Sequence, residues 1–375
     1  MSIPASSEPF CVLVIGGYGF FGRRLVERLS LQPGLHVVVA GRSAQRAAAL
    51  VASLQPTSRA TLAPVALDAL SDELPGWLDR LRVRAVVHAS GPFQGQDYRV
   101  ALACTAAGIH YIDLADGRGF VAGIVAVDVA ATAAGVSVSS GASSVPALSG
   151  AAVDAMTHGW QRVDDIDIGI SPGNRTERGL STIQAGLSYS GQPILHDDGK
   201  TLTGWLRLRL HRYAKPVGWR PLSPCDVPDL VLLPARYPGR PVVRFGAGLE
   251  LFALHLGMNA MALVARLGIV RDWGAHATRL KRWSDRLSTL GTDAGAMHVS
   301  VRGLDAQGQP ARRTWTLLAV AGDGPWVPTL AAAALVRKLA AGAAPAIGAR
   351  PCVGELTLDD FARETAGRQI TWRIE

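Results

Sequence analysis

The sequence has little lysine, and its basic residues are not clustered. Only four of its 38 basic residues are lysine, and the arginines are scattered along the chain. A nucleic-acid-binding surface needs a dense basic patch, often interleaved with aromatic residues. The net charge of +8 therefore predicts binding of an anionic small molecule and argues against a nucleic-acid partner.

Cysteine is also scarce. The four cysteines, Cys11, Cys104, Cys225 and Cys352, are far apart in the sequence. None belongs to a CxxC pair or to a Cys and His spacing typical of a metal site, so we expect no metal. Few and widely spaced cysteines fit a reducing compartment, and we expect a cytoplasmic protein.

Long apolar runs are absent as well. The longest notable stretch, residues 251–265, has fifteen residues without a formal charge and contains His255 and Asn259. A membrane-spanning helix needs about 20 predominantly apolar residues. The stretch therefore predicts a buried helix rather than a span, with peripheral membrane contact as the alternative.

A glycine-rich motif near the start is the strongest positive signal. Residues 12–15 are apolar and β-branched, as a central parallel strand requires, and Leu25 and Leu29 mark one face of a following helix. Between them lies a GxGxxG motif made of Gly17, Tyr18, Gly19, Phe20, Phe21 and Gly22. Such a turn lets backbone N–H groups at a helix start hold a pyrophosphate. The motif predicts a dinucleotide site; a strand-turn-helix that binds nothing is the alternative.

The second predicted strand, residues 36–40, indicates which dinucleotide is bound. A carboxylate at its end would bond the ribose 2′-hydroxyl of NAD, but Arg42 and Ser43 occupy this region instead. A guanidinium suits a 2′-phosphate, so we expect NADP, with NAD less favoured. Asp68 follows a third strand at 61–67 and either contacts adenine or is a surface carboxylate.

Later segments extend this α/β pattern. A strand at 85–89 leads into Ser90, Gly91 and Pro92, which we expect beneath the nicotinamide ribose. Further strands are predicted at 110–114 and 136–139. After about residue 155, alternating segments at 165–170, 203–210, 241–245, 298–301 and 314–320 predict an antiparallel sheet.

An alanine-rich helix opened by Pro328 is expected to return to the first domain. We therefore expect a Rossmann doubly wound parallel sheet with an inserted α+β domain. The dinucleotide-binding domain would comprise residues 1–155 plus 325–375, and the substrate and dimerisation domain residues 156–324.

Several segments together resemble one known family. The segments GGYGFFGRRLVERL, AGRS, HASGPFQGQDYRVALACTAAGIHYIDLADG and GASSVPALS are similar to those of saccharopine dehydrogenase-like proteins, over roughly residues 10–150. The resemblance implies a Rossmann domain, an inserted α+β domain and a C-terminal return. It also implies reduction of imines, or, in another branch, trans-acting reduction of enoyl groups in lipid synthesis.

Candidates for catalysis and substrate binding follow from this chemistry. A protonated imine accepts hydride more readily, so a nearby acid helps, and Asp113, Tyr98 and His298 are the candidates. Each could instead be structural. A carboxylate substrate needs basic residues, and the polar segments after residue 155 offer Arg175, Arg178, Arg236 and Tyr237. Surface ion pairing is the alternative for these four. Asp226 and Asp229 could bind a substrate amine or cap a turn.

Three functions remain open from the sequence. The first is an NADP-dependent oxidoreductase acting on a C=N bond of an amino-acid-like small molecule. The second is reduction of a C=C bond on an acyl or lipid-like substrate, with the apolar helix at 251–265 lining a tunnel. A cavity lined by leucines favours the second, and one lined by arginines the first. The third is a non-catalytic NADP-binding protein. An exposed sheet face in the second domain favours a homodimer.

Overall fold

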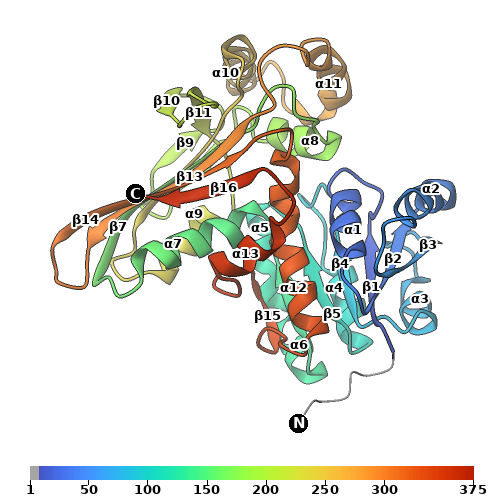
Figure 1. Cartoon of the computed structure of the whole chain (residues 1–375). Coiled ribbons are helices and arrows are strands. Elements are labelled where there is room, and N and C mark those ends of the chain that lie inside the picture. Colours follow the sequence, from blue (N-terminus) through green and yellow to red (C-terminus); the bar gives the residue numbers. More distant parts are fainter. Residues whose placement is uncertain (1–7) are drawn as a thin grey trace.

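The computed structural model describes residues 8–375 and contains two seven-stranded sheets (Figure 1). The first sheet has the order β15-β6-β5-β4-β1-β2-β3, and every pairing in it is parallel. Its strands are β1 (Phe10–Ile15), β2 (Leu35–Gly41), β3 (Thr61–Ala66), β4 (Ala85–His88), β5 (His110–Asp113), β6 (Ser137–Ser140) and β15 (Gly348–Pro351). This order is that of a Rossmann-type doubly wound sheet.

Helices cover both faces of this sheet. Successive side chains of a strand point to opposite faces, and Val12 packs with α1 and α2 whereas Leu13 packs with α3 and α4. The helices are α1 (Gly22–Ser30), α2 (Ala44–Leu54), α3 (Leu74–Arg80), α4 (Arg99–Ala106), α5 (Arg118–Gly123) and α6 (Asp128–Ala134). Because both faces are covered, β1 is apolar throughout rather than alternating.

The second sheet is mixed rather than purely antiparallel. Its order is β10-β11-β12-β7-β13-β14-β16, and β12 runs parallel to β7 while the other pairs are antiparallel. The strands are β7 (Arg162–Ser171), β10 (Arg209–Arg212), β11 (Trp219–Pro224), β12 (Val242–Ala247), β13 (Gly295–Leu304), β14 (Pro310–Ala319) and β16 (Ile370–Ile374). A separate hairpin pairs β8 (Pro193–Leu195) with β9 (Thr201–Thr203).

Seven further α-helices complete the part of the chain that the structure describes. Helix α7 (Ser149–Thr157) and α9 (Asp229–Arg236) lie under the second sheet, and α8 (Leu180–Ser188), α10 (Phe252–Arg266) and α11 (Ala277–Asp285) lie at its far end (Figure 1). The alanine-rich α12 (Leu330–Ala340) packs on α1 and on α13 (Leu358–Glu364). One continuous apolar core links α1, α7 and α12 with the inner face of the second sheet.

Three details differ from the expectations drawn from the sequence. The expected strand at 203–210 is divided between β9 and β10, with a turn around Trp205 and Arg207, which both have positive φ angles. The C-terminal segment does return to the first sheet through β15, but β16 then pairs with β14 in the second sheet. The helix at 251–265, which was expected to be buried, is mostly exposed or half-buried. Only Leu254, His255 and Ala262 of this helix are buried. The expected first domain also included residues 1–7, which lie outside the described range.

Candidate active site

The glycine turn after β1 is closed by contacts that leave no room for side chains. Gly16 has a φ of +75°, so this residue, rather than Gly17, adopts the left-handed conformation of the turn. A Cβ on Gly22 would lie 2.0 Å from the Gly16 carbonyl oxygen, and one on Gly17 would lie 2.9 Å from that of Val14. Gly22 therefore lets α1 start directly against the turn.

The same turn leaves backbone donors free at the start of α1. Within the described chain, the amides of Phe20 and Phe21 donate to no backbone carbonyl, whereas the Gly19 amide bonds the Gly16 carbonyl oxygen at 2.8 Å. A Cβ on Gly19 would meet only Gly16 atoms within 4 Å. Free amides at a helix N-terminus beside an open glycine fit the pyrophosphate of a dinucleotide.

The end of β2 carries a small cluster suited to the adenosine half of the cofactor. The Tyr18 ring lies on Gly41, where a Cβ would be 2.5 Å from it, and the Ser43 amide donates to the Tyr18 hydroxyl at 2.8 Å. The Arg46 guanidinium lies over the Tyr18 ring at 4.7 Å. Arg42 is exposed beside this cluster. Sequence reasoning missed Arg46, although its place in the first turn of a helix capped by Ser43 could have indicated it.

The loops after β3 and β4 differ in their surroundings. Asp68 is exposed, and its Oδ1 accepts the Leu70 amide. Ser90 lies against the glycine turn, since a Cβ on Gly16 would be 3.0 Å from it. The peptide bond between Gly91 and Pro92 is cis, and Gln96 donates to the carbonyl oxygens of Ser90 and Pro92.

His88, in β4, is a satisfied core residue. Its ring nitrogens bond Tyr111 Oη at 3.1 Å and Ser90 Oγ at 2.7 Å. Burial lowers the pKa of His88 to about 4, so the ring is neutral at physiological pH. His88 is therefore a core residue rather than a proton donor.

A cavity of about 490 Å³ lies between the two domains, at the carboxyl ends of β1, β5 and β6. This edge of a doubly wound sheet is where ligands bind. The cavity extends from Phe20 and Phe21 in the glycine turn to α10 and α11. Its lining is mostly apolar, and Arg178 is the one basic side chain among the described residues that form it.

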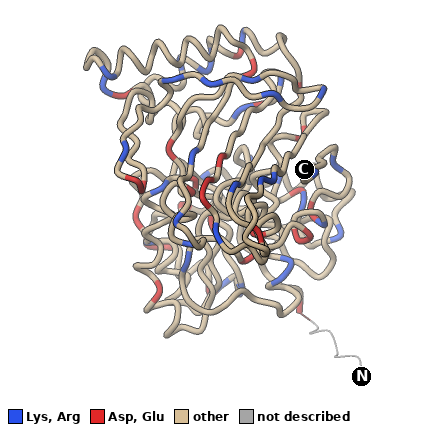
Figure 2. Tube along the Cα trace, turned by 90° about the vertical axis from the view of Figure 1, so that its left-hand side faces the viewer, with Lys and Arg blue, Asp and Glu red and all other residues tan. Residues whose placement is uncertain are grey.

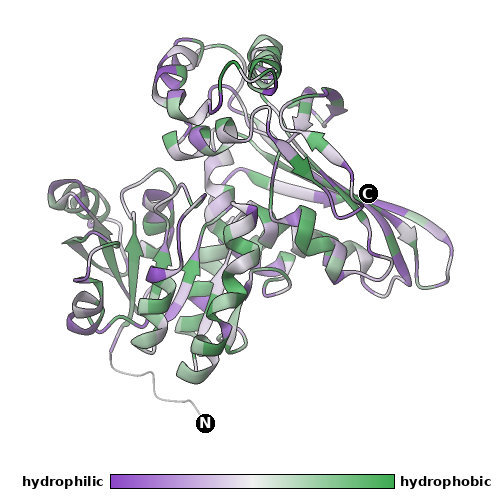
Figure 3. Cartoon of the chain, turned by 180° about the vertical axis from the view of Figure 1, so that it is seen from behind, coloured by the Kyte–Doolittle hydropathy of each residue, from purple (hydrophilic) through white to green (hydrophobic). Residues whose placement is uncertain are grey.

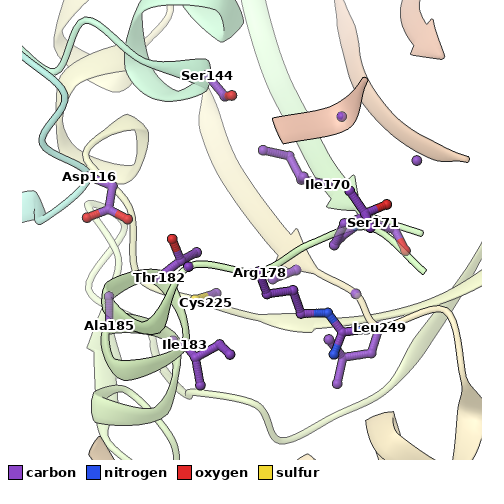
Figure 4. Close-up of a pocket in the computed structure, with 18 of the residues that line it drawn as sticks. Asp116, Ser144, Ile170, Ser171, Arg178, Thr182, Ile183, Ala185, Cys225 and Leu249 are labelled. Atoms are coloured by element: carbon purple, nitrogen blue, oxygen red, sulfur yellow. The ribbon is translucent and has the colours of Figure 1, made fainter. Parts of the chain in front are cut away.

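Among the polar groups that face this cavity, Asp116 and Arg178 come from different domains (Figure 4). Asp116 follows β5 and accepts a hydrogen bond from Gln94 Nε2 at 3.3 Å. Burial raises the pKa of Asp116, and the Gln94 hydrogen bond opposes this only in part. Gln94 Nε2 also donates to the Tyr189 hydroxyl at 2.9 Å, and Tyr189 lines the cavity as well.

Arg178 comes from the loop between β7 and α8. Its Nη2 donates to the Asn174 side-chain oxygen and, at 3.0 Å, to the Asn174 carbonyl oxygen. Its Nε is buried and has no hydrogen-bond partner within residues 8–375. Burial lowers the pKa of the guanidinium. A partly buried guanidinium on the wall of a cavity can hold an anionic group of a ligand.

The same loop closes onto the glycine turn. Glu177 forms ion pairs with Arg23 and Arg24 in the first turn of α1. The Arg24 guanidinium also lies 4.3 Å over the Phe20 ring, and a Cβ on Gly179 would lie 2.9 Å from that ring. The second domain therefore contacts the first directly beside the glycine turn, residues 16–22, which we call the cofactor cradle.

The three candidates for catalysis occupy different places. Asp113 does not line the cavity, and its Oδ1 accepts bonds from Ser140 Oγ and from the amides of Ala115 and Gly141. Burial raises its pKa to about 6, and these bonds act in the opposite direction. Asp113 thus connects the loop after β6 to the end of β5.

Tyr98 and His298 also lie outside the cavity lining. The Tyr98 hydroxyl donates to the Phe120 carbonyl oxygen at 2.8 Å. His298 bonds the Tyr213 hydroxyl at 2.8 Å and stacks on His211 at 3.7 Å. The His298 ring therefore packs beside Tyr213 and His211 rather than in the cavity. Burial lowers the pKa of His298.

The candidates for substrate binding are also separated. Arg178 lines the cavity, but Arg175 is exposed outside it. Arg236 pairs with Asp154 at 2.7 Å, and the Tyr237 hydroxyl donates to the same carboxylate at 2.7 Å. These two residues tie α9 to α7 and do not reach the cavity.

The two remaining acidic candidates also differ. Asp226 lines the cavity and pairs with Arg118. Asp229 is buried, accepts a bond from Ser149 Oγ, and has a pKa that burial raises to about 7.

Comparison with known proteins agrees with this geometry. Residues 12–146 match a family described as "Saccharopine dehydrogenase NADP binding domain". No curated protein sequence matches the chain. Among solved structures, it is similar to apo saccharopine dehydrogenase (L-Glu forming) from Saccharomyces cerevisiae, with a TM-score of 0.65 and 13% identity over 97% of this chain and 99% of that one. It is also similar to an amine dehydrogenase from Mycobacterium smegmatis, with a TM-score of 0.46 and 10% identity over 93% and 96%.

The cradle and the family match together define the class of protein. It is an NAD(P)-dependent oxidoreductase with a Rossmann domain and a second, mixed-sheet domain. The matched domain belongs to the saccharopine dehydrogenase-like NAD(P)-binding family, and the likeness to the yeast enzyme extends the shared fold over both domains.

Proposed function

We propose that the protein is an NADP-dependent reductase of an activated C=C bond on an acyl or lipid-like substrate. One observation carries this proposal: the surface of the cavity beside the cofactor cradle is mostly apolar. Pockets of 300–1,000 Å³ with few polar groups are typical of small-molecule sites, and an apolar lining selects an apolar ligand. Leu187, Leu249 and Leu254 contribute to this lining.

The cofactor would supply a hydride, which carries both electrons of the reduction, and it would leave as NADP⁺. The substrate double bond must then gain one proton to balance the reaction. Asp116 is the candidate for holding that proton, because it lines the cavity and its raised pKa favours the protonated form. Arg178 would stabilise the negative charge that develops on the carbonyl oxygen of the acyl chain when the hydride is added.

The choice of NADP rests on the cluster at the end of β2. Arg46 lies over the Tyr18 ring in the first turn of α2. Arg42 directly precedes Ser43, which caps that helix. Two guanidinium groups and a helix N-terminus favour a 2′-phosphate, and the described cluster contains no carboxylate to repel it.

Reduction of a C=N bond in an amino-acid-like substrate is the second candidate. Arg178 and Asp116 favour it, because a partly buried cation and a carboxyl in one cavity can hold the carboxylate and the nitrogen of such a substrate. The cavity offers only this one basic side chain, however, and a substrate with two or more carboxylates would leave charges unpaired.

The decisive experiment compares the two substrate classes under NADPH oxidation. Enoyl thioesters of increasing chain length would be assayed beside amine and keto-acid pairs that form imines. We expect kcat/KM to rise with chain length, because each buried CH₂ contributes about 0.8 kcal/mol. Turnover of imines alone would overturn the C=C proposal and support the second candidate.

The homodimer and the cytoplasmic location remain predictions.

A further inference from the structure

Helix α10 is apolar on two opposite faces. Leu254, Met258 and Met261 line the cavity on one face. On the other, Phe252, Leu256 and Leu263 recur at helical spacing and are 45%, 54% and 49% exposed. Leu267 and Ile269, just after the helix, are 66% and 71% exposed. We call these five residues the α10 stripe; Figure 3 shows α10 coloured mostly as hydrophobic at the end of the molecule distant from the Rossmann sheet. Contiguous exposed apolar surface of this kind marks an interaction site.

The cavity reaches the surface beside this stripe. Ala253 and Gly257 on α10 and Trp283 on α11 line the cavity, yet all three are exposed, Trp283 by 57%. A residue that both lines a cavity and contacts solvent lies at its mouth. The cavity therefore opens between α10 and α11, next to the α10 stripe.

The segment that ends α10 and includes α11 is rich in basic residues. Residues 266–290 contain six Lys or Arg and two Asp, which gives a net charge of +4. Lys281 pairs with Asp285 at 2.7 Å, and the Asp272 carboxylate accepts the Gly274 amide. No ion pair within residues 8–375 involves the other five, Arg266, Arg271, Arg279, Arg282 and Arg286. Figure 2 shows basic residues at this end of the molecule.

We propose that the α10 stripe and the arginines around it dock on an anionic lipid bilayer surface, with the cavity mouth facing the lipid. None of the helices in the described part of the chain is long and apolar enough to cross a membrane, so the contact would be interfacial. An apolar helix face beside arginines is the pattern of such contacts, in which the apolar residues enter the acyl boundary and the cations meet anionic headgroups.

Docking would serve the reaction by delivering an apolar substrate directly from the bilayer. This last step rests on the proposed function, whereas lipid binding itself does not. The test must therefore measure binding without turnover. An enzyme that binds vesicles but reduces no enoyl substrate would contradict the proposed function and leave the docking surface intact.

The experiment is flotation of the full chain with vesicles of phosphatidylcholine and phosphatidylglycerol at 3:1, and with phosphatidylcholine alone. We expect binding to the anionic vesicles at low salt and its loss at high salt. The double variant Arg279→Glu/Arg282→Glu should weaken vesicle binding about thirtyfold or more, since each basic residue near such a surface strengthens binding about fivefold. Leu256→Glu/Leu263→Glu should weaken it by at least as much.

Matched controls come from the first domain. Val129→Glu changes an apolar residue that is 82% exposed on α6, and Arg59→Glu reverses an exposed arginine that follows α2. Both should bind vesicles as the parent does, within about twofold, because α6 and α2 lie in the Rossmann domain, away from α10. NADPH binding by calorimetry would report that every variant is folded.

Three results would overturn the proposal. The first is an absence of vesicle binding by the parent chain at low salt, and the second is equal binding by all four variants. The third is a concentration-dependent dimer in sedimentation that Leu256→Glu/Leu263→Glu abolishes while vesicle binding stays unchanged. In that case a second copy of the chain would cover the α10 stripe.

Discussion

Replacing Gly22 or Gly19 by alanine should separate the structural and cofactor-binding parts of the glycine turn. The Gly22 Cβ would lie 2.0 Å from the Gly16 carbonyl oxygen, more than 1 Å inside normal contact, so α1 must move away from β1. Leu25, Val26 and Leu29 of α1 are fully buried, and this shift disturbs their packing. Overpacking of this kind costs about 1–3 kcal/mol, and we expect Gly22→Ala to lower Tm by about 5 °C or more.

Gly19→Ala should behave differently. Its Cβ would be 2.9 Å from the same oxygen and would meet no other residue, so the turn must shift, but by much less than Gly22→Ala requires. The new methyl group would stand where the pyrophosphate approaches the backbone. We therefore expect a Tm within about 2 °C of the parent and an NADPH Kd raised about tenfold or more.

The assays are thermal unfolding and calorimetric titration with NADPH. Gly119→Ala is the control, because this exposed glycine in α5 has open space for a Cβ. It should change neither the NADPH Kd nor, beyond a slight rise, the Tm. An unchanged Tm for Gly22→Ala would contradict the close packing of α1 on the turn, and an unchanged Kd for Gly19→Ala would refute the assignment of this turn as the cofactor cradle.

Three further predictions test other parts of the site. Arg42→Ala/Arg46→Ala should raise the Kd of NADPH about tenfold or more and leave that of NADH unchanged, as measured by calorimetry; equal effects on both cofactors would contradict the assigned preference. Asp116→Asn should lower kcat about a hundredfold. Because burial raises the Asp116 pKa and the acid form is the active one, the parent rate should fall as pH rises through this pKa, and the variant should lack that dependence. Asp229→Asn should remove a pH-dependent loss of stability: the Asp229 pKa rises from 3.8 to about 7, so the parent should lose up to about 4 kcal/mol, relative to the variant, as pH rises from 4 to 7. If the free energies of unfolding of parent and variant change in parallel as pH rises across this range, the assignment of a buried, protonated carboxyl would be wrong.

Local features of the first domain followed well from sequence. The first strand and the glycine turn each depend on residues within a few positions of one another. The hydrophobic period and the steric demands of such short segments are present in the sequence itself.

The second domain was less accessible to the same reasoning. The alternating pattern predicted strands but not their partners, and β16 joins the second sheet because β14 offers its edge there. Residues 251–265 have the composition of a buried helix, yet α10 covers the cavity with one face only. Pairing and burial of this kind depend on segments far apart in the chain.

The sequence by itself determined that a dinucleotide cradle follows the first strand, because the closest contact in the turn, between Gly22 and Gly16, joins residues six positions apart. Only the tertiary structure decided which side chains share the cavity. Asp116 and Arg178 reach it from different domains, while Asp113, His298 and Arg236 are held elsewhere by distant partners. The physical reason is that a side chain's direction is set by its own strand or helix, but what it meets is set by the packing of elements that lie far apart in the sequence.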